Sequence, residues 1–329
     1  MTDSEIDTVA LLEQGLEHHQ SGRLQEAENF YREILDHEPE NSDALHYLGL
    51  LAAQGGSPDL GIQMIVQALT LDPENGAAHG NLGNILRDKG RCEEAAQHFR
   101  KSIELDESVA GAHADLGRAL MDMGQFDDAA QSFEKAVALD PDSLEALSDL
   151  GIAYINLGNT EQAAEKFKQA IAMRPDIPDF YLNLGLALQV QEKLDEALEN
   201  FKHAETLNKD HPDYAFNIGN VYLMQGNGDE ALVAYDRALS LNPKMANVLC
   251  NKGGLLVDLE RQDDAVDCFR GAIEAEPELA LAHFQLSQVL KSQGQTEEAE
   301  ASFKKAISLE KNPENCQAFE QIHNGNPVS

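Results

Sequence analysis

The amino-acid sequence predicts an all-α protein made of one helical hairpin repeated along the chain. Small and large residues recur with a period of 34 residues over nearly the whole length. Within each period, apolar residues are spaced by three and four positions, which places them on one face of a helix. A single hairpin of this kind cannot bury its apolar face, so we expect successive copies to stack on one another.

The first helix of the hairpin is clearest in the stretch from Ala110 to Gly124. Leu116, Gly117 and Leu120 lie on one face of this helix. Gly124 ends this helix.

The second helix follows at once and ends before Pro141. Asp127 and Asp128 place negative charge at its start, where the helix dipole favours it. Ala129 is small because the two helices cross closely, and Phe133 is expected to fill the space beside the crossing.

The same residue types recur in register with this stretch. Counterparts of Gly117 are Gly15, Gly49, Gly83, Gly151, Gly185, Gly219 and Gly253, with Ser287 in the last copy. Counterparts of Phe133 are Tyr31, Phe99, Phe167, Phe201, Tyr235, Phe269 and Phe303. Counterparts of the turn residue Gly124 are Gly22, Gly56, Gly90, Gly158, Gly226 and Gly294.

This strict period with these residue types resembles the tetratricopeptide repeat (TPR) family. The resemblance implies an all-α, right-handed TPR solenoid, an α-α superhelix of nine hairpins closed by a C-terminal capping helix. The expected repeats are 8–41, 42–75, 76–109, 110–143, 144–177, 178–211, 212–245, 246–279 and 280–313. We expect residues 1–7 to form a lead-in, 314–323 the capping helix and 324–329 a disordered tail.

Some repeats depart from the pattern. In the first, Gln14 replaces the buried leucine, as an end repeat needs, because no earlier hairpin covers that face. The sixth and eighth carry Glu192 and Glu260 at the turn glycine, which we expect to cost little. Lys252 stands at the buried leucine position of the eighth, where its long stem could reach a nearby carboxylate.

The capping helix is expected to bury a short apolar set. Ala318, Phe319 and Ile322 form that set, and polar residues fall between them. The helix should therefore have one face in solvent.

The composition limits the classes of partner. Fifty-eight acidic residues against 24 basic ones give a formal net charge of −34. Such a surface argues against nucleic acid or an anionic membrane as the main partner. It is compatible with a basic protein partner, with solubility alone, or with adaptation to high salt.

The cysteines and the N-terminal residues favour a soluble cytoplasmic protein. Cys250 and Cys268 fall in the two helices of one repeat and are expected to be free thiols. No short paired cysteine spacing typical of zinc or redox sites occurs. The acidic start of the sequence predicts no signal peptide, and no apolar run predicts a membrane span.

The sequence predicts no enzyme, no cofactor and no metal site. It contains no phosphate-binding glycine loop after a strand and no legible catalytic constellation. His79, His113 and His283 stand at equivalent repeat positions, so we interpret them as structural residues.

The repeat array instead offers a surface. In TPR proteins the first helix of each hairpin lines the concave side and receives an extended segment of a partner. The resemblance places a row of polar residues there: Asn81, Asp115, Asp149, Asn183, Asn217 and Asn251, with Asn84 and Asn220 in a second row. This pattern is similar to the asparagine ladder of O-GlcNAc transferase and its relatives. An amide side chain both donates and accepts hydrogen bonds, so such a row can bind the backbone of a peptide of any sequence. Solvated polar side chains are the other interpretation.

Towards the C-terminus the same face becomes more apolar. Its residues there include Phe216, Leu223, Met224, Val257 and Phe284. Apolar residues on a surface expected to be wet often mark a binding patch, although burial against neighbouring repeats would also account for them.

The predicted function is that of a protein–protein interaction scaffold or adaptor. The predicted groove residues are Asn81, Asn84, Asn183, Phe216, Asn217, Asn220, Leu223, Asn251, Val257 and Phe284. The expected partners are protein or peptide segments that are basic or carry apolar anchors. The alternatives are a self-assembling structural protein and a targeting subunit for a separate enzyme such as a glycosyltransferase.

Overall fold

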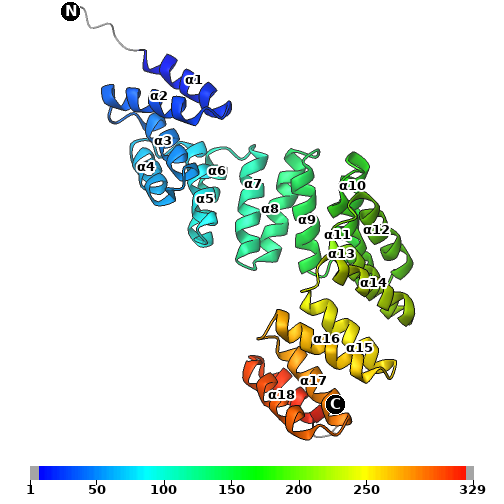
Figure 1. Ribbon diagram of the computed structural model, residues 1–329. Helices are drawn as coiled ribbons and strands as arrows, with labels where there is room; N and C mark the ends of the chain where they lie inside the picture. Colours follow the sequence, from blue (N-terminus) through cyan, green and yellow to red (C-terminus); the bar gives the residue numbers. More distant parts are fainter. Residues whose placement is uncertain (1–6, 324–329) are drawn as a thin grey trace, which may run out of the picture. The chain divides into compact units, whose positions relative to one another are not determined.

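The computed structural model describes residues 7–323, which form nineteen α-helices and no strand (Figure 1). This confirms the predicted all-α solenoid of TPR-like helical hairpins. The lead-in and the tail expected at the chain ends lie outside the described residues, apart from Asp7. The Asp7 side chain accepts a hydrogen bond from the backbone N–H of Ala10 and so caps the first helix.

The helices group into two compact units with a boundary between Met173 and Arg174. In the first unit, the first helices of the hairpins are α1 (Thr8–Gln20), α3 (Ser42–Gln54), α5 (Gly76–Asp88), α7 (Ala110–Asp122) and α9 (Leu144–Asn156). Their partners are α2 (Leu24–His37), α4 (Pro58–Leu71), α6 (Cys92–Leu105), α8 (Phe126–Leu139) and α10 (Thr160–Met173).

The second unit repeats the same alternation. Its first helices are α11 (Pro178–Val190), α13 (Pro212–Met224), α15 (Ala246–Asp258) and α17 (Ala280–Ser292). Their partners are α12 (Leu194–Leu207), α14 (Gly228–Leu241), α16 (Gln262–Ala275) and α18 (Thr296–Leu309), and α19 (Pro313–His323) follows as the capping helix. Consecutive helices pack on one another from α1 to α10 in the first unit and from α11 to α18 in the second.

An aromatic ring lying on a glycine holds each regular hairpin together. A Cβ atom at Gly117 would lie only 2.6 Å from Cε1 of Phe133, which is closer than real Cβ atoms approach. The Phe133 side chain is 1% exposed, so the ring is enclosed between the two helices. The same contact recurs between Gly83 and Phe99, and between Gly185 and Phe201. The expected pairing of a small residue with a large one is therefore confirmed.

The second hairpin reaches a close crossing in another way. Ile65 stands in place of the aromatic residue and is fully buried. A Cβ atom at Gly61 would lie 2.6 Å from the carbonyl oxygen of Gly49. The two glycines thus let the backbones of α3 and α4 approach where the filling side chain is smaller.

The last hairpin departs from the pattern because Ser287 replaces the glycine. Its partner Phe303 is only half-buried, whereas the aromatic residues of the glycine-containing hairpins are at most 1% exposed. The ring of His323 stacks on Phe303 at a centroid distance of 3.8 Å. His323 is consequently 6% exposed, whereas Ile322 is 41% exposed. The expectation that Ile322 belongs to the buried face of α19 was wrong, because the histidine takes that place.

Two polar residues stand at the buried leucine position, and each is accommodated differently. Gln14 is exposed on the end hairpin, as expected. Lys252 is half-buried, and its Nζ lies 2.5 Å from Oδ1 of Asp236 on α14. The aliphatic part of the Lys252 side chain therefore lets its ammonium group form an ion pair with a carboxylate, as hypothesised.

The three equivalent histidines have a structural role. In His79, His113 and His283 the Nε2 atom lies 3.0–3.1 Å from the backbone carbonyl oxygen six residues earlier. A carbonyl oxygen only accepts, so Nε2 is the donor, and each ring ties its helix to the preceding loop.

The turn between the two helices of a hairpin requires a left-handed residue. Seven glycines occupy this position, with φ between 71° and 87°. In α11–α12 and α15–α16 the position is held by Glu192 and Glu260, with φ of 58° and 60°. A side chain in this region costs roughly 1–2 kcal/mol relative to glycine.

None of the helices formed by residues 7–323 combines the length and the apolar character that crossing a membrane requires.

We expect Glu192→Gly and Glu260→Gly each to stabilise the protein by about 1 kcal/mol, because glycine relieves the left-handed strain. Denaturant midpoints measured by circular dichroism would show the gain. As a control, Glu199→Gly places the same substitution inside the regular helix α12 and should instead cost about 1 kcal/mol. Destabilisation by all three variants would contradict the strain argument.

We expect Phe133→Ala to cost roughly 3–5 kcal/mol locally, because it empties a fully enclosed site. In a repeat array the damage should stay near the altered hairpin. Hydrogen exchange should rise in α7, α8 and adjacent helices. An equal rise in α1 would count against this one-dimensional coupling.

Candidate functional site

The predicted groove residues all lie on first helices, but they divide between the two units. Asn81 and Asn84 lie on α5 in the first unit, and Asn183 lies on α11 in the second. The second unit brings the remaining seven close together on three successive first helices. These are Phe216, Asn217, Asn220 and Leu223 on α13, Asn251 and Val257 on α15, and Phe284 on α17.

Two of the asparagines join neighbouring hairpins in the second unit. Nδ2 of Asn251 donates a hydrogen bond to Oδ1 of Asn220 over 2.9 Å. The hydroxyl of Tyr235 donates to the same oxygen over 2.8 Å. Burial raises the pKa of Tyr235 to about 12, so this hydroxyl remains a donor at neutral pH. The Asn220 amide N–H groups and the side-chain carbonyl oxygen of Asn251 take no part in these two hydrogen bonds, so they are available to other partners.

The asparagine row is not uniform. Nδ2 of Asn217 donates to the backbone carbonyl of Asp213 within its own helix, over 2.8 Å. In the first unit, Nδ2 of Asn84 donates to Asp115 over 3.1 Å. The periodic pattern therefore hides different local contacts, because Asn217 bonds within its own helix whereas Asn84 bonds to the next hairpin.

Arginine completes a polar network across α5, α7 and α9. Arg118 lies 3.0 Å from Oδ1 of Asp115 and 2.7 Å from Oδ2 of Asp149. Burial raises the pKa of Asp149, and the charge of Arg118 opposes that shift. In this unit the polar groups of the first-helix face largely satisfy one another.

Asn81 contacts a buried histidine. Its Nδ2 lies 2.8 Å from Nε2 of His46, a side chain that is fully buried. Burial, with a smaller effect of His19, lowers the pKa of His46 to about 4. The neutral ring therefore accepts the hydrogen bond from Asn81.

The second unit contains a cavity of about 390 Å³ on its first-helix face. Leu223, Val257 and Phe284 give it apolar walls, and Asn251 lies at its side. A Cβ atom at Gly254 would meet only Nε2 of Gln285, 3.9 Å away. The glycine therefore leaves room for an incoming side chain.

Two predicted apolar residues are more enclosed than a free binding patch would require. Phe284 is 7% exposed and stacks on Phe319 of α19 at a centroid distance of 4.1 Å. Phe216 is half-buried, packs against the core around Tyr235 and does not line the cavity. Phe284 therefore forms a wall, whereas Leu223 and Val257 are the more accessible apolar groups.

Sequence reasoning missed Gln285. Its Oε1 atom is buried and lacks a hydrogen-bond partner among the described residues. The residue stands 34 positions after Asn251 and so continues the amide row by one step. The period itself could have identified it, although the larger amide interrupts the run of asparagines.

Cys250 also lines this cavity, and we expect its thiol to be a poor nucleophile at neutral pH. Both Cys250 and Cys268 are buried and free. Burial raises the pKa of Cys250 to about 11, so the thiol stays protonated at neutral pH. Among the described residues no group of three or more potential metal ligands gathers in one place.

Three protein-family models match parts of this chain. The model of the cilia and flagella-associated protein 70 C-terminal domain matches residues 106–322. Models of the TPR repeat and the tetratricopeptide repeat match residues 83–124 and 12–64. No curated protein matches the chain.

Solved structures share the fold at low identity. A tetratricopeptide repeat protein from Parabacteroides merdae has a TM-score of 0.62 and 17% identity, covering 76% of this chain and 99% of its own. PilF of Pseudomonas aeruginosa has a TM-score of 0.55 and 20% identity, covering 66% and 98%. YrrB, described as a TPR protein with an unusual peptide-binding site, has a TM-score of 0.51 and 24% identity, covering 57% and 97%.

The buried histidine predicts a pH dependence. Its folded-state pKa lies below the unfolded value near 6.5, so the unfolded chain binds the proton more readily between pH 6.5 and about 4. Stability from His46 is present above pH 6.5 and is lost as the pH falls through this window, by roughly 3 kcal/mol in total. Denaturant midpoints at pH 7 and pH 4 would measure it. His46→Gln should lose less stability on acidification, and an identical loss would exclude His46 as the cause.

Proposed function

Because this chain belongs to the tetratricopeptide repeat family described as the cilia and flagella-associated protein 70 C-terminal domain, we propose that it is a non-catalytic scaffold for an extended partner segment. The binding surface that we propose is the first-helix face of the second unit, around the cavity beside Gly254. The observation that carries the proposal is this apolar cavity with amide groups at its side.

The cavity suits an apolar anchor. Leu223 and Val257 offer partly exposed apolar surface, and Gly254 leaves the space between them and Gln285 open. Burial of one aliphatic side chain contributes about 1.5–3 kcal/mol, enough for an anchor but too little for a stable complex on its own. Additional contacts must therefore come from the peptide backbone.

The amide side chains beside the cavity can form hydrogen bonds with the backbone of a bound peptide. Gln285 offers a buried acceptor without a partner, and Asn251 keeps its carbonyl oxygen free of the contact with Asn220. These oxygens can accept backbone N–H groups, while the Asn220 amide can donate to a backbone carbonyl. Neither contact depends on the partner's sequence, so the apolar anchor would provide the specificity.

The formal charge of −34 supports basic flanks beside the anchor. Association should then weaken as salt increases, because the attraction between exposed charges is screened. YrrB offers a precedent for a peptide-binding site on this fold, but the proposal for this chain rests on its own residues. The likeness of the amide row to O-GlcNAc transferase remains a hypothesis.

The test is to block the cavity. We expect Gly254→Leu to weaken binding of the captured partner's segment at least about tenfold, because the new side chain occupies the anchor's place. Partners would be captured from the native cell, divided into overlapping synthetic peptides and measured by fluorescence anisotropy.

Gly111→Leu is the matched control. A Cβ atom there meets nothing within 4 Å, and the residue is exposed in α7. Both substitutions place leucine at a helical glycine, so a general effect of helix propensity would appear in both variants. If Gly254→Leu leaves affinity intact while Arg87→Glu with Arg118→Glu removes it, the partner binds the first unit instead.

A further inference from the structure

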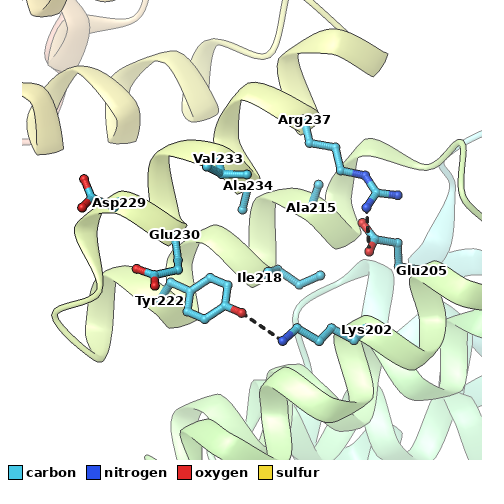
Figure 2. A pocket seen from close by; sticks show the side chains of 10 residues that line it. All are labelled: Lys202, Glu205, Ala215, Ile218, Tyr222, Asp229, Glu230, Val233, Ala234 and Arg237. Atoms are coloured by element: carbon cyan, nitrogen blue, oxygen red, sulfur yellow. Dashed lines mark hydrogen bonds and ion pairs between the residues drawn. The ribbon is translucent and has the colours of Figure 1, made fainter.

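The second unit has another cavity, on a different side of α13. It has a volume of about 450 Å³ and is lined by residues of α12, α13 and α14 (Figure 2). It shares no lining residue with the cavity beside Gly254. Its size is within the range of sites for small molecules.

Two departures from the repeat lie at this cavity. Ala215 is small where every other repeat carries a bulky side chain. Those residues are Leu11, Leu45, His79, His113, Leu147, Tyr181, Leu249 and His283. Glu205 is charged where every other repeat is aliphatic. Those residues are Leu35, Leu69, Ile103, Val137, Ile171, Leu239, Ile273 and Ile307.

A third departure makes the rim apolar. Val233 is 70% exposed. Polar residues occupy its position in seven other repeats, and Ala301 occupies it in the last. The polar residues are Asn29, Gln63, Gln97, Gln131, Glu165, Glu199 and Asp267. Repeat 212–245 has thus lost internal filling at Ala215 and gained an exposed apolar group at Val233, while Glu205 belongs to the repeat before it.

The charge of Glu205 is compensated inside the cavity. Its Oε2 atom lies 3.0 Å from Nη1 of Arg237, and its side chain is 16% exposed. This pair needs no further ion. The apolar surface beside it comes from Ala215, Ile218 and Ala234.

Lys202 is the cation that remains available. Its Nζ donates a hydrogen bond to Oη of Tyr222 over 2.9 Å, and no carboxylate of residues 7–323 lies within 4.0 Å of it. Because Tyr222 accepts this bond, its own O–H proton is free to donate. In Figure 2 the Tyr222 hydroxyl points towards Lys202, and Asp229 and Glu230 lie beyond the other end of the ring. Two donors therefore meet at one end, and negative charge occupies the other.

We propose that this cavity binds a small amphipathic carboxylate. Its apolar chain or ring lies against Ala215 and Val233, replacing the filling that the other repeats supply from their own side chains. Its carboxylate accepts hydrogen bonds from Lys202 Nζ and Tyr222 Oη, which are charge-assisted and therefore strong. The acidic residues of α14 set the orientation, because they repel the carboxylate from the opposite end.

The probe is 5-phenylvalerate, with its uncharged amide, 5-phenylvaleramide, as the matched ligand. Titration calorimetry and ligand-observed NMR on the full chain would measure both. The carboxylate should bind about tenfold more tightly than the amide, and Lys202→Gln should abolish that preference while amide binding persists. Lys168→Gln makes the same change at the same position one repeat earlier and should alter nothing.

Filling the cavity gives an independent test. Ala215→Leu and Val233→Gln introduce residue types that other repeats carry at these positions, so each should weaken binding of both probes while the helical circular dichroism stays unchanged. Val233 is exposed, so its substitution does not threaten the fold. Gly254→Leu should leave 5-phenylvalerate binding intact, because the two cavities are separate. Equal affinity for acid and amide, or unchanged affinity in folded Ala215→Leu, would overturn the proposal.

Discussion

The contact between an aromatic ring and a glycine backbone sets the geometry of this protein. In seven of the hairpins a Cβ atom on the glycine would stand 2.5–2.6 Å from the ring of its partner helix. The ring lies against the bare backbone of the glycine at nearly the same distance each time. Neighbouring hairpins then present similar surfaces to one another, which allows them to stack.

The exceptions show how strictly this contact governs packing. Where Ile65 replaces the ring, Gly61 removes a side chain and lets the helices approach. Where Ser287 replaces the glycine, Phe303 is only half-buried and the ring of His323 stacks on it. A change on one side of the crossing is accompanied by an adjustment on the other, because neither void nor overlap is tolerated in a packed interior.

Repetition also makes functional differences visible. At each of the two cavities of the second unit described above, a side chain departs from its periodic type. Gly254 opens the first-helix face, and Ala215 opens the side between α12 and α14. Both cavities belong to the second unit. In the first unit, Arg118 and its acidic partners fill the corresponding first-helix surface with mutual contacts.

The sequence by itself determined the all-α hairpin fold, the small and large residues at the crossing and the positions of the turn residues. These follow from local rules: apolar spacing defines a helix face, and a repeated glycine marks a position that needs no side chain. It also placed the candidate residues on first helices, because that assignment depends on the period alone. Even Gln285 could have been found by counting 34 residues from Asn251.

Tertiary structure alone decided which candidates are accessible. Phe284 and Leu223 are both apolar residues that the sequence places on first helices. In the structure Phe319 of α19 stacks on Phe284, whereas Leu223 remains partly exposed. His323 displaced Ile322 from the buried face because a flat ring stacks on Phe303. Such outcomes depend on side chains from different helices competing for one space. No periodic pattern records that competition, since it is settled by shape and distance after the helices have packed.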